Sequence, residues 1–293
     1  GFIGKKIINE LIQRGDEITI FTRSIDKAKQ IIPDAAEYVE WNLNLDNWQA
    51  ALEDKYAVIH LAGENVMAKR WNELHKKNIF NSRIDTTRAL VKAIENAADK
   101  PKVFISASAV GFYGSSEQPV TEESLSGKDF LAGVVKAWEE ETKKVDLLKV
   151  RRVNVRTGIV LDKNEGALAQ MITPFKFFIG GPLGTGKQWF PWIHIDDVVK
   201  IFLFAIDNQK VSGALNASSP NPLRMKEFCK TLGRVMHRPS LFKVPAFIIK
   251  IIFGEAADVL LNGAQVIPEK TIKAGYNFRF ETAEEALKNL LHK

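Results

Sequence analysis

The feature that most constrains this chain is its beginning, where two glycines, three residues apart, open a helical run. Residues 1–4 read Gly-Phe-Ile-Gly, and a strand-like segment over 17–21 then leads to Thr22-Arg23-Ser24. Glycines at a helix N-terminus let backbone N–H groups approach a pyrophosphate, and the helix end adds partial positive charge. The start of the chain therefore predicts the phosphate-binding half of a dinucleotide fold.

The motif also predicts what surrounds it. A complete version has a strand and a further glycine upstream, and we expect both to precede Gly1 in the natural protein. Two glycines in this spacing can also simply cap a helix, so the prediction depends on the segments downstream. The residues predicted to contact the cofactor here are Gly1, Phe2, Ile3 and Gly4.

Strand-like and helix-like segments alternate through the first half of the chain. The predicted strands lie at 17–21, 37–41, 56–61, 103–106 and 149–155, and the predicted helices at 47–52, 79–97, 130–145, 195–206 and 225–236. This alternation is typical of a parallel sheet with helices on both faces. It predicts an α/β fold, a Rossmann-type doubly wound parallel sheet with a smaller C-terminal substrate or lid region.

The domain organisation follows from the end of the regular strand–helix alternation after Gly158. We predict an NADP-binding Rossmann domain over 1–160 and a mixed segment over 161–293. Within the mixed segment, the helix at 196–206 returns to the sheet and the remainder forms the C-terminal lid. The glycine-rich loop 180–187 lacks the P-loop pattern because Gln188 follows Lys187, so we interpret it as part of the lid.

Charge and composition exclude several classes of function. The net charge of +6 comes from scattered lysines with no basic block, which disfavours nucleic acid binding. A single cysteine, Cys229, and histidines without metal-ligand spacing predict no metal site. The apolar stretch 246–253 is too short to span a bilayer, so no membrane is expected. We expect a cytoplasmic monomer or homodimer with an unidentified small-molecule substrate.

The end of the second predicted strand indicates which coenzyme binds. An NAD-preferring fold places a carboxylate at this position, against the ribose hydroxyl. Here the residue is the neutral Thr22, followed by Arg23 and Ser24, which can hold a 2′-phosphate by a charge-assisted fork and a hydrogen bond. An arginine that is merely solvated at a strand end is the alternative. Together with the glycines, the pattern predicts NADP(H).

Further cofactor contacts are expected where other predicted strands end. Leu61, Ala62 and Gly63 close the strand 56–61, and small residues there let a ribose or pyrophosphate lie over the backbone. Glu64 follows directly, and Asn42 follows the strand 37–41. An ordinary strand-to-loop turn is the alternative at Leu61–Gly63. Glu64, Asn65 and Arg70 are also candidates for substrate binding, or for simple solvation of the loop.

Several longer motifs resemble a known family, the extended short-chain dehydrogenase/reductases. The segment from Ser106 to Gly114 (SASAVGFYG) is similar to their serine-rich strand end followed by Tyr-Gly, and Pro191–Val198 (PWIHIDDV) resembles their later His-x-x-Asp segment. A narrower resemblance is to the atypical epimerase-family subgroup. It rests on the motifs GEN at 63–65, RW at 70–71, NSR at 81–83, RTGIVL at 156–161, FPWIHI at 190–195, QVIP at 265–268 and KAGY at 273–276.

The resemblance implies a Rossmann fold that binds NADP(H). It also implies that Thr22, Arg23, Leu61, Ala62 and Arg83 lie near the cofactor, with Ser106 at the neighbouring strand end. The tail is similar to that subgroup's C-terminal domain of unassigned function. The sequence departs from the wider family at its Tyr-x-x-x-Lys dyad. Alignment on Glu139 puts Leu131 and Val135 at the two dyad positions, and Lys136 is one residue out of register.

Three residues remain as catalytic candidates. Ser108 matches the family's catalytic serine, Tyr113 could replace the lost phenol, and His194 could act as an acid or base near neutral pH. Each has a structural alternative. Ser106 and Ser108 can bond strand-end backbone, Tyr113 can be a packed aromatic, and His194 can cap the next helix.

Two functions therefore remain open. The first is an NADP(H)-dependent oxidoreductase or epimerase-like enzyme acting on a small hydroxyl- or carbonyl-bearing substrate. The second is a non-catalytic NADP(H)-binding sensor or interaction module, which the missing dyad favours.

Overall fold

The fold is built around a four-stranded parallel sheet. A computed structural model describes residues 1–43 and 48–292. The sheet has the order β10 (Gly213–Ala217), β6 (Arg151–Thr157), β4 (Val103–Ala109) and β3 (Ala57–His60), and β1 (Thr19–Thr22) forms a separate parallel pair with β2 (Glu37–Glu40). The predicted α/β class with a parallel sheet is confirmed.

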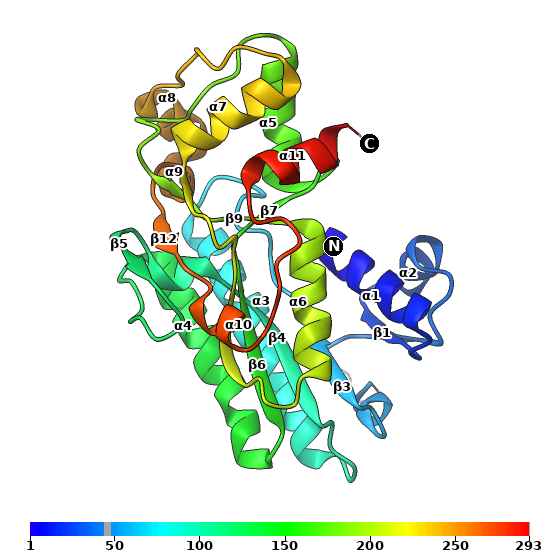
Figure 1. The fold of residues 1–293 in the computed structure, drawn as a ribbon. Helices are drawn as coiled ribbons and strands as arrows, with labels where there is room; N and C mark the ends of the chain where they lie inside the picture. Colours follow the sequence, from blue (N-terminus) through cyan, green and yellow to red (C-terminus); the bar gives the residue numbers. More distant parts are fainter. Residues whose placement is uncertain (44–47, 293) are drawn as a thin grey trace.

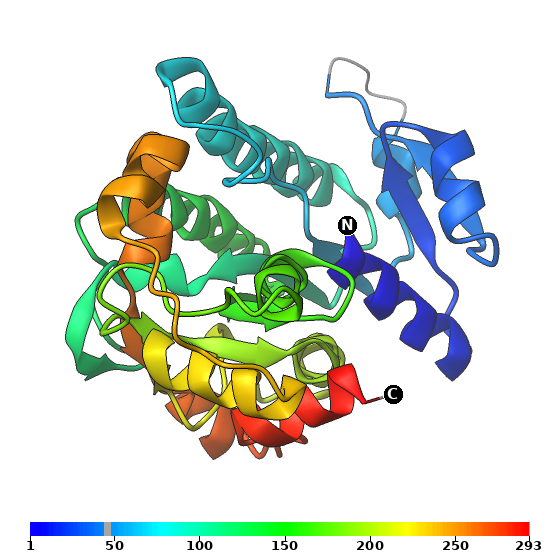
Figure 2. The same ribbon diagram turned by 90° about the horizontal axis from the view of Figure 1, so that it is seen from above.

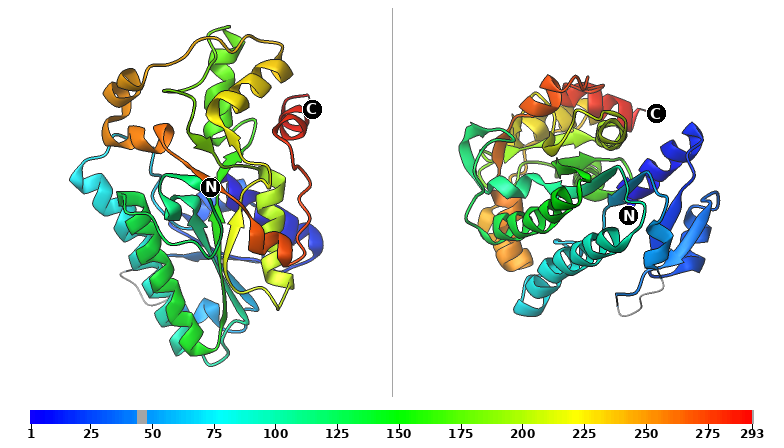
Figure 3. Two further views of the ribbon diagram at one scale, coloured as in Figure 1. Left: turned by 60° about the vertical axis from the view of Figure 1, so that its left-hand side comes forward. Right: turned by 90° about the horizontal axis from the view of Figure 1, so that it is seen from below.

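Helices cover both faces of this sheet (Figures 1 and 3). On one face lie α1 (Phe2–Arg14) and α6 (Ile195–Asp207), whose apolar side chains share a core with those of β4, β6 and β10. On the other face, α3 (Glu73–Asn96) and α4 (Phe130–Thr142) pack against each other and against the sheet. Helix α6 spans the predicted helix over 196–206 and packs on the sheet.

The upper part of the molecule in Figure 1 has its own core. It joins α5 (Gly166–Lys176), α7 (Met225–Met236) and α11 (Ala283–Leu291) through residues such as Phe175, Phe228 and Leu287. Short strands connect this region to the sheet, namely β7 (Ile159–Leu161), β8 (Trp189–Phe190), β9 (Trp192–His194) and β11 (Leu223–Arg224). The remaining elements are α2 (Ile25–Ile31), β5 (Ser116–Val120), α8 (Ala246–Phe253), α9 (Ala257–Leu261), β12 (Ala264–Val266), α10 (Glu269–Lys273) and the 3-10 turns η1 (Gln49–Leu52), η2 (Val110–Tyr113), η3 (Lys143–Leu148) and η4 (Gly254–Ala256).

The start of one helix and the presence of one strand differ from the sequence-based prediction for physical reasons. Helix α3 begins at Glu73 rather than at 79, because the Asn72 side chain caps it by accepting a hydrogen bond from the His75 N–H at 2.8 Å. That first turn is polar and carries no apolar periodicity. Strand β10 was not predicted, because its sequence Gly-Ala-Leu-Asn-Ala has few residues that favour strands. The predicted helix 47–52 is η1, and its first residue, Asn47, lies outside the described residues.

Candidate functional site

The carboxyl ends of the parallel strands meet the start of α1 in the middle of the molecule (Figure 2). Gly4 lies against the end of β3, since a Cβ built on it would be 3.1 Å from the Leu61 Cδ1 atom. The first backbone hydrogen bond of α1 runs from the Lys5 N–H to the Gly1 carbonyl at 3.0 Å, and no side chain caps the helix. The N–H groups of Phe2, Ile3 and Gly4 therefore keep their donor capacity, as a bound anion requires.

At the end of β1, the predicted 2′-phosphate residues form a short turn. The Ser24 N–H donates to the Thr22 hydroxyl at 3.2 Å, which positions both residues before α2. Arg23 is exposed and forms no ion pair with any residue in the described ranges 1–43 and 48–292. Its guanidinium is thus available to an anion in solution. Asn42 follows β2 by two residues and is half-buried.

At the end of β3, a half-buried arginine contacts the loop that was predicted to contact the cofactor. Arg83 Nη1 donates to the Glu64 carbonyl at 3.1 Å and to the Ile79 carbonyl at 2.9 Å. A Cβ on Gly63 would lie 3.1 Å from the Arg83 Cζ atom, so glycine permits this close approach. The Glu64 N–H also donates to Ser82 Oγ at 2.9 Å. Burial lowers the pKa of Arg83 below its ordinary value.

The predicted substrate residues further along this loop have local partners. The Asn65 side chain accepts a hydrogen bond from the Met67 N–H at 2.9 Å, and the guanidinium of Arg70 lies beside Gly254 of η4. Lys76 of α3 also forms an ion pair with Glu255. The start of α3 therefore contacts the C-terminal segment, while Glu64 and Asn65 lie in the loop between β3 and α3.

Ser108 lies at the carboxyl end of β4, where it is held by a carboxylate. Its hydroxyl donates to Glu139 Oε1 at 2.6 Å, and only 5% of the residue is exposed. Arg156 at the end of β6 completes the group, because its Nε and Nη2 atoms donate to the two Glu139 oxygens at 2.8 Å each. The hydroxyl proton of Ser108 thus forms the hydrogen bond to Glu139, and the lone pairs of the Ser108 oxygen can accept a hydrogen bond from another group.

Tyr113 belongs to the same buried network. Its hydroxyl donates to Asn216 Oδ1 at 2.6 Å and accepts from Arg156 Nη1 at 2.9 Å. Burial raises the pKa of Tyr113 to about 12, although Arg156 opposes the shift. The phenol therefore stays protonated near neutral pH and its hydrogen bonds are made within the protein.

A second carboxylate joins this network to the C-terminal segment. Glu122, 7% exposed, accepts hydrogen bonds from the backbone N–H groups of Asn216, Lys270 and Thr271 at 3.0, 3.0 and 3.3 Å. The Thr271 hydroxyl bridges it to the Asn216 carbonyl. Helix α10 is therefore attached to β10 beside Tyr113 through buried polar contacts.

Sequence reasoning gave no functional role to Glu139, Arg156, Glu122 or Asn216. The available signal was the arginine at the end of the apolar strand around Val155, since a charged residue inside a buried strand needs a partner. Ser106, by contrast, is fully buried, and its hydroxyl donates to the Ala107 carbonyl at 2.9 Å. This contact is the structural alternative stated for that residue.

The face of α4 beside Ser108 has no catalytic phenol or amine. Val135 is buried and Leu131 is half-buried, whereas Lys136 is exposed. The side chain that α4 does direct at Ser108 is Glu139, two turns after Leu131. The two residues aligned with the Tyr-x-x-x-Lys dyad, Leu131 and Val135, therefore offer no group that can transfer a proton.

His194 caps α6. Its Nδ1 atom accepts a hydrogen bond from the Asp196 N–H at 3.0 Å, and its ring stacks on Phe280 with centroids 3.8 Å apart. The side chain is 1% exposed, and burial lowers its pKa to about 4. The geometry supports the helix-capping alternative, with a neutral imidazole near pH 7.

This pKa predicts a pH dependence of stability. The pKa of His194 falls from 6.5 to about 4 on folding. Between these two pH values the unfolded chain binds a proton at this residue and the folded chain does not. Stability should fall by about 1.4 kcal/mol per pH unit from this residue alone. We expect His194→Asn, which keeps a capping acceptor, to show a shallower loss between pH 6 and pH 5 in urea unfolding.

The control for this experiment is His237→Asn. His237 is exposed at the end of α7 with φ of 55°, a conformation that asparagine tolerates. It should leave the pH dependence of the wild type unchanged. Equal slopes for the two variants would contradict the assignment to His194.

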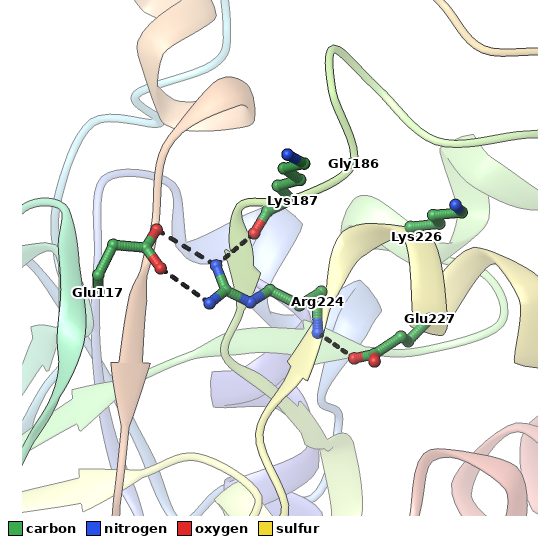
Figure 4. Close-up of a pocket in the computed structure, with 6 residues that line it drawn as sticks. All are labelled: Glu117, Gly186, Lys187, Arg224, Lys226 and Glu227. Atoms are coloured by element: carbon green, nitrogen blue, oxygen red, sulfur yellow. Dashed lines mark hydrogen bonds and ion pairs between the residues drawn. The ribbon is translucent and has the colours of Figure 1, made fainter.

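A surface pocket of about 460 Å³ lies away from these residues, beside β8 and β11 (Figure 4). It is lined by Glu117, Gly186, Lys187, Arg224, Lys226 and Glu227. Arg224 is held there by Glu117 through bonds of 2.8 and 3.2 Å and lies over the Trp189 ring. Of the predicted elements, the loop 180–187 and the helix 225–236 reach it. Within the described ranges, no cluster of three acidic, histidine or cysteine side chains could hold a metal ion.

Comparison with known proteins places these features in context. The profile of the NAD dependent epimerase/dehydratase family matches residues 1–132 and 162–217, and that of a domain of unknown function, DUF1731, matches residues 244–290. The chloroplastic SDR39U1 homologue of Arabidopsis thaliana, an epimerase family protein, is 41% identical over 99% of this chain and 84% of its own length. The epimerase family protein YfhF of Bacillus subtilis is 36% identical over 99% of this chain and 95% of its own length.

A solved structure extends the likeness to three dimensions. The crystal structure of human epimerase family protein SDR39U1 (isoform 2) with NADPH superimposes with a TM-score of 0.89 at 33% identity. The superposition covers 100% of this chain and 96% of the human one. The predicted resemblance to the epimerase subgroup, including its C-terminal domain, is thereby confirmed.

Proposed function

The chain belongs to the NAD dependent epimerase/dehydratase family, and from that premise we propose that it is an NADP(H)-dependent oxidoreductase or epimerase. Its substrate would be a small molecule bearing a hydroxyl or carbonyl group. The observation that carries the catalytic part is the hydrogen bond from Ser108 to the ion-paired Glu139 at the carboxyl edge of the sheet.

The residues at this edge fit the coenzyme. The uncapped N–H groups at the start of α1 suit its pyrophosphate. Arg23, exposed and without an ion pair to any residue that the structure describes, suits a 2′-phosphate. Small residues after β3 leave room for the ribose, above a loop that Arg83 holds in place. NADP(H), when bound, provides hydride chemistry. The human relative was crystallised with NADPH, which supports the same coenzyme here.

Ser108 would transfer the proton of the substrate hydroxyl group. Because its own proton is donated to Glu139, Ser108 can accept a hydrogen bond from a substrate hydroxyl. As the substrate oxygen loses its proton to Ser108 Oγ, the serine proton moves to Glu139 Oε1, which Arg156 holds in position. The reverse transfer would protonate a carbonyl oxygen. Tyr113 takes no part in this relay, since both of its hydrogen bonds are internal.

A second candidate function is a non-catalytic NADP(H)-binding module. The observation that favours it is the burial of all three catalytic candidates, since Ser108 is 5%, Tyr113 4% and His194 1% exposed. The absence of a phenol or amine at Leu131 and Val135 points the same way. The two functions share the coenzyme and differ only in turnover.

The test separates binding from turnover. We expect calorimetry to detect NADPH binding by the wild type, and a panel of alcohols and carbonyl compounds to reveal turnover monitored by coenzyme absorbance. Ser108→Ala should lower kcat roughly 100-fold or more, within the usual range for loss of a proton-transfer group, with NADPH affinity unchanged.

The matched control is Ser115→Ala, an exposed serine in the neighbouring loop, which should retain full turnover. Turnover that survives Ser108→Ala would contradict the relay. Tight NADPH binding with no turnover across the panel would favour the non-catalytic module, and no coenzyme binding would contradict both functions.

A further inference from the structure

Helix α8 presents an apolar face to solvent. Phe247 and Ile251 are 64% and 68% exposed and lie one turn apart, as do Ile248 and Ile252 at 37% and 54%. Only Ile249 of this helix is buried. A surface helix ordinarily turns its apolar side chains inward, so the outward face of α8 requires a partner.

Two neighbouring loops extend this face. The segments 177–184 and 240–246 run side by side, joined by hydrogen bonds from the Phe242 N–H to the Gly180 carbonyl and from the Gly184 N–H to the Val244 carbonyl at 3.2 and 2.9 Å. Both segments lie with α8 at the end of the molecule away from the C-terminal ends of α3 and α4 (Figures 1 and 3). We call the exposed apolar residues of these three segments the apolar rim: Phe177, Phe178, Ile179, Leu241, Phe242, Phe247, Ile248, Ile251 and Ile252.

The charged residues on the three segments of the apolar rim are lysines, and Glu255, which follows α8, is paired with Lys76. Lys176, Lys243 and Lys250 are exposed and form no ion pair with any described residue, and Arg238 lies 4.5 Å over the Phe178 ring. The stretches 166–195 and 228–254, which contain every residue of the apolar rim, hold no aspartate or glutamate, whereas Glu255 and Asp258 follow α8. The apolar rim is therefore complementary to a negatively charged surface.

We propose that the apolar rim docks on the surface of a membrane that contains anionic phospholipids. Exposed phenylalanine and isoleucine side chains bind the boundary between headgroups and acyl chains, and flanking lysines are attracted to anionic lipid. This attachment is peripheral, since no helix in the described part of the chain is long and apolar enough to cross a bilayer. It revises the expectation from sequence that no membrane is involved, which considered spanning alone.

Charge also argues against the other occupants. In a symmetric dimer through this face, each apolar rim would meet the same lysines on its partner. Lysine is also depleted in protein–protein interfaces, whereas it is favoured next to anionic membranes. The lipid surface is thus the occupant that the observed side chains fit.

Vesicle flotation of the full chain tests the proposal. We expect the wild type to float with vesicles of equimolar phosphatidylcholine and phosphatidylserine at low salt, and to remain behind with phosphatidylcholine alone. Phe247→Ser with Ile251→Ser should lower the partition coefficient roughly tenfold or more, and Lys243→Gln with Lys250→Gln roughly fivefold for each lysine. Because all four side chains are exposed, unfolding midpoints should not change.

Matched controls lie at the opposite end of the molecule. Leu147→Ser, at an 86% exposed residue, and Lys92→Gln with Lys102→Gln should float as the wild type does. A wild type that floats with neither vesicle, or rim variants that float normally, would overturn the proposal. If the Phe247→Ser, Ile251→Ser variant instead dissolved a dimer seen by sedimentation equilibrium, or only acidic polypeptides bound the apolar rim, the face would belong to a protein partner.

Discussion

Replacing Arg156 with methionine is expected to lower the free energy of unfolding by about 3–5 kcal/mol, the usual cost of removing one partner of a buried ion pair. Arg156 and Glu139 are 4% and 6% exposed, and two bonds of 2.8 Å join their charged groups. Without the guanidinium, the Glu139 carboxylate would remain buried, with Ser108 as its remaining side-chain donor among the described residues. The loss should be measured by urea unfolding at pH 7.

Arg156 also has contacts that methionine cannot replace. Its Nη1 atom donates to the Tyr113 hydroxyl and to the Glu122 carbonyl, and its guanidinium lies 3.6 Å over the Phe112 ring. These groups belong to the turn after β4 and to the loop that holds α10. The variant should therefore also loosen the C-terminal segment, seen as faster amide exchange at Lys270 and Thr271.

Arg152 offers a matched control, because it lies on the same strand, β6, four residues before Arg156. It pairs with Asp146, whose side chain is 48% exposed, so Arg152→Met should cost at most about 1 kcal/mol. Adding Glu139→Gln to Arg156→Met should recover part of the loss, because the unpaired buried charge is removed. Equal losses for Arg152→Met and Arg156→Met would contradict the buried-pair account.

Replacing Arg23 with glutamate is expected to weaken NADPH binding roughly 10- to 100-fold, while NADH binding stays the same or improves. A hydrogen bond to a charged group contributes about 1.5–3 kcal/mol, and the new carboxylate would repel a 2′-phosphate. Arg23 is exposed at the end of β1 and has no competing partner among the described residues. Calorimetry with each coenzyme measures the ratio of the two affinities.

The control must change the charge equally without approaching the coenzyme. Lys102→Glu does so, because Lys102 is exposed just before β4, at the amino edge of the sheet. It should leave the NADPH-to-NADH ratio unchanged. If Arg23→Glu left the ratio unchanged as well, Arg23 would not be the residue that selects the phosphorylated coenzyme.

Much of the fold was predictable because its signals are local. Apolar periodicity predicted α7 with the bounds that the structure shows, and β1, β3 and β4 lie where alternating or apolar runs predicted them. The glycines of the first turn, Arg23, and Gly63 are also local signals, since each depends on the backbone or charge of a few consecutive residues. The start of α3 and strand β10 escaped prediction because a polar capped turn and a short Ala- and Gly-containing strand carry no periodic pattern.

The contacts among Ser108, Glu139 and Arg156 could not be predicted from the sequence. Sequence alone determined the class of the fold, the coenzyme that the strand-end residues favour, and the absence of a phenol and an amine at Leu131 and Val135. Only the tertiary structure decided what Ser108 touches, since its partner Glu139 lies 31 residues away on α4 and Arg156 lies a further 17 residues on. Periodicity reports which face of an element is buried, but the meeting of two polar groups depends on the register and packing of separate elements. For the same reason, only the folded chain could reveal that the apolar side chains of α8 and its neighbouring loops face outward together.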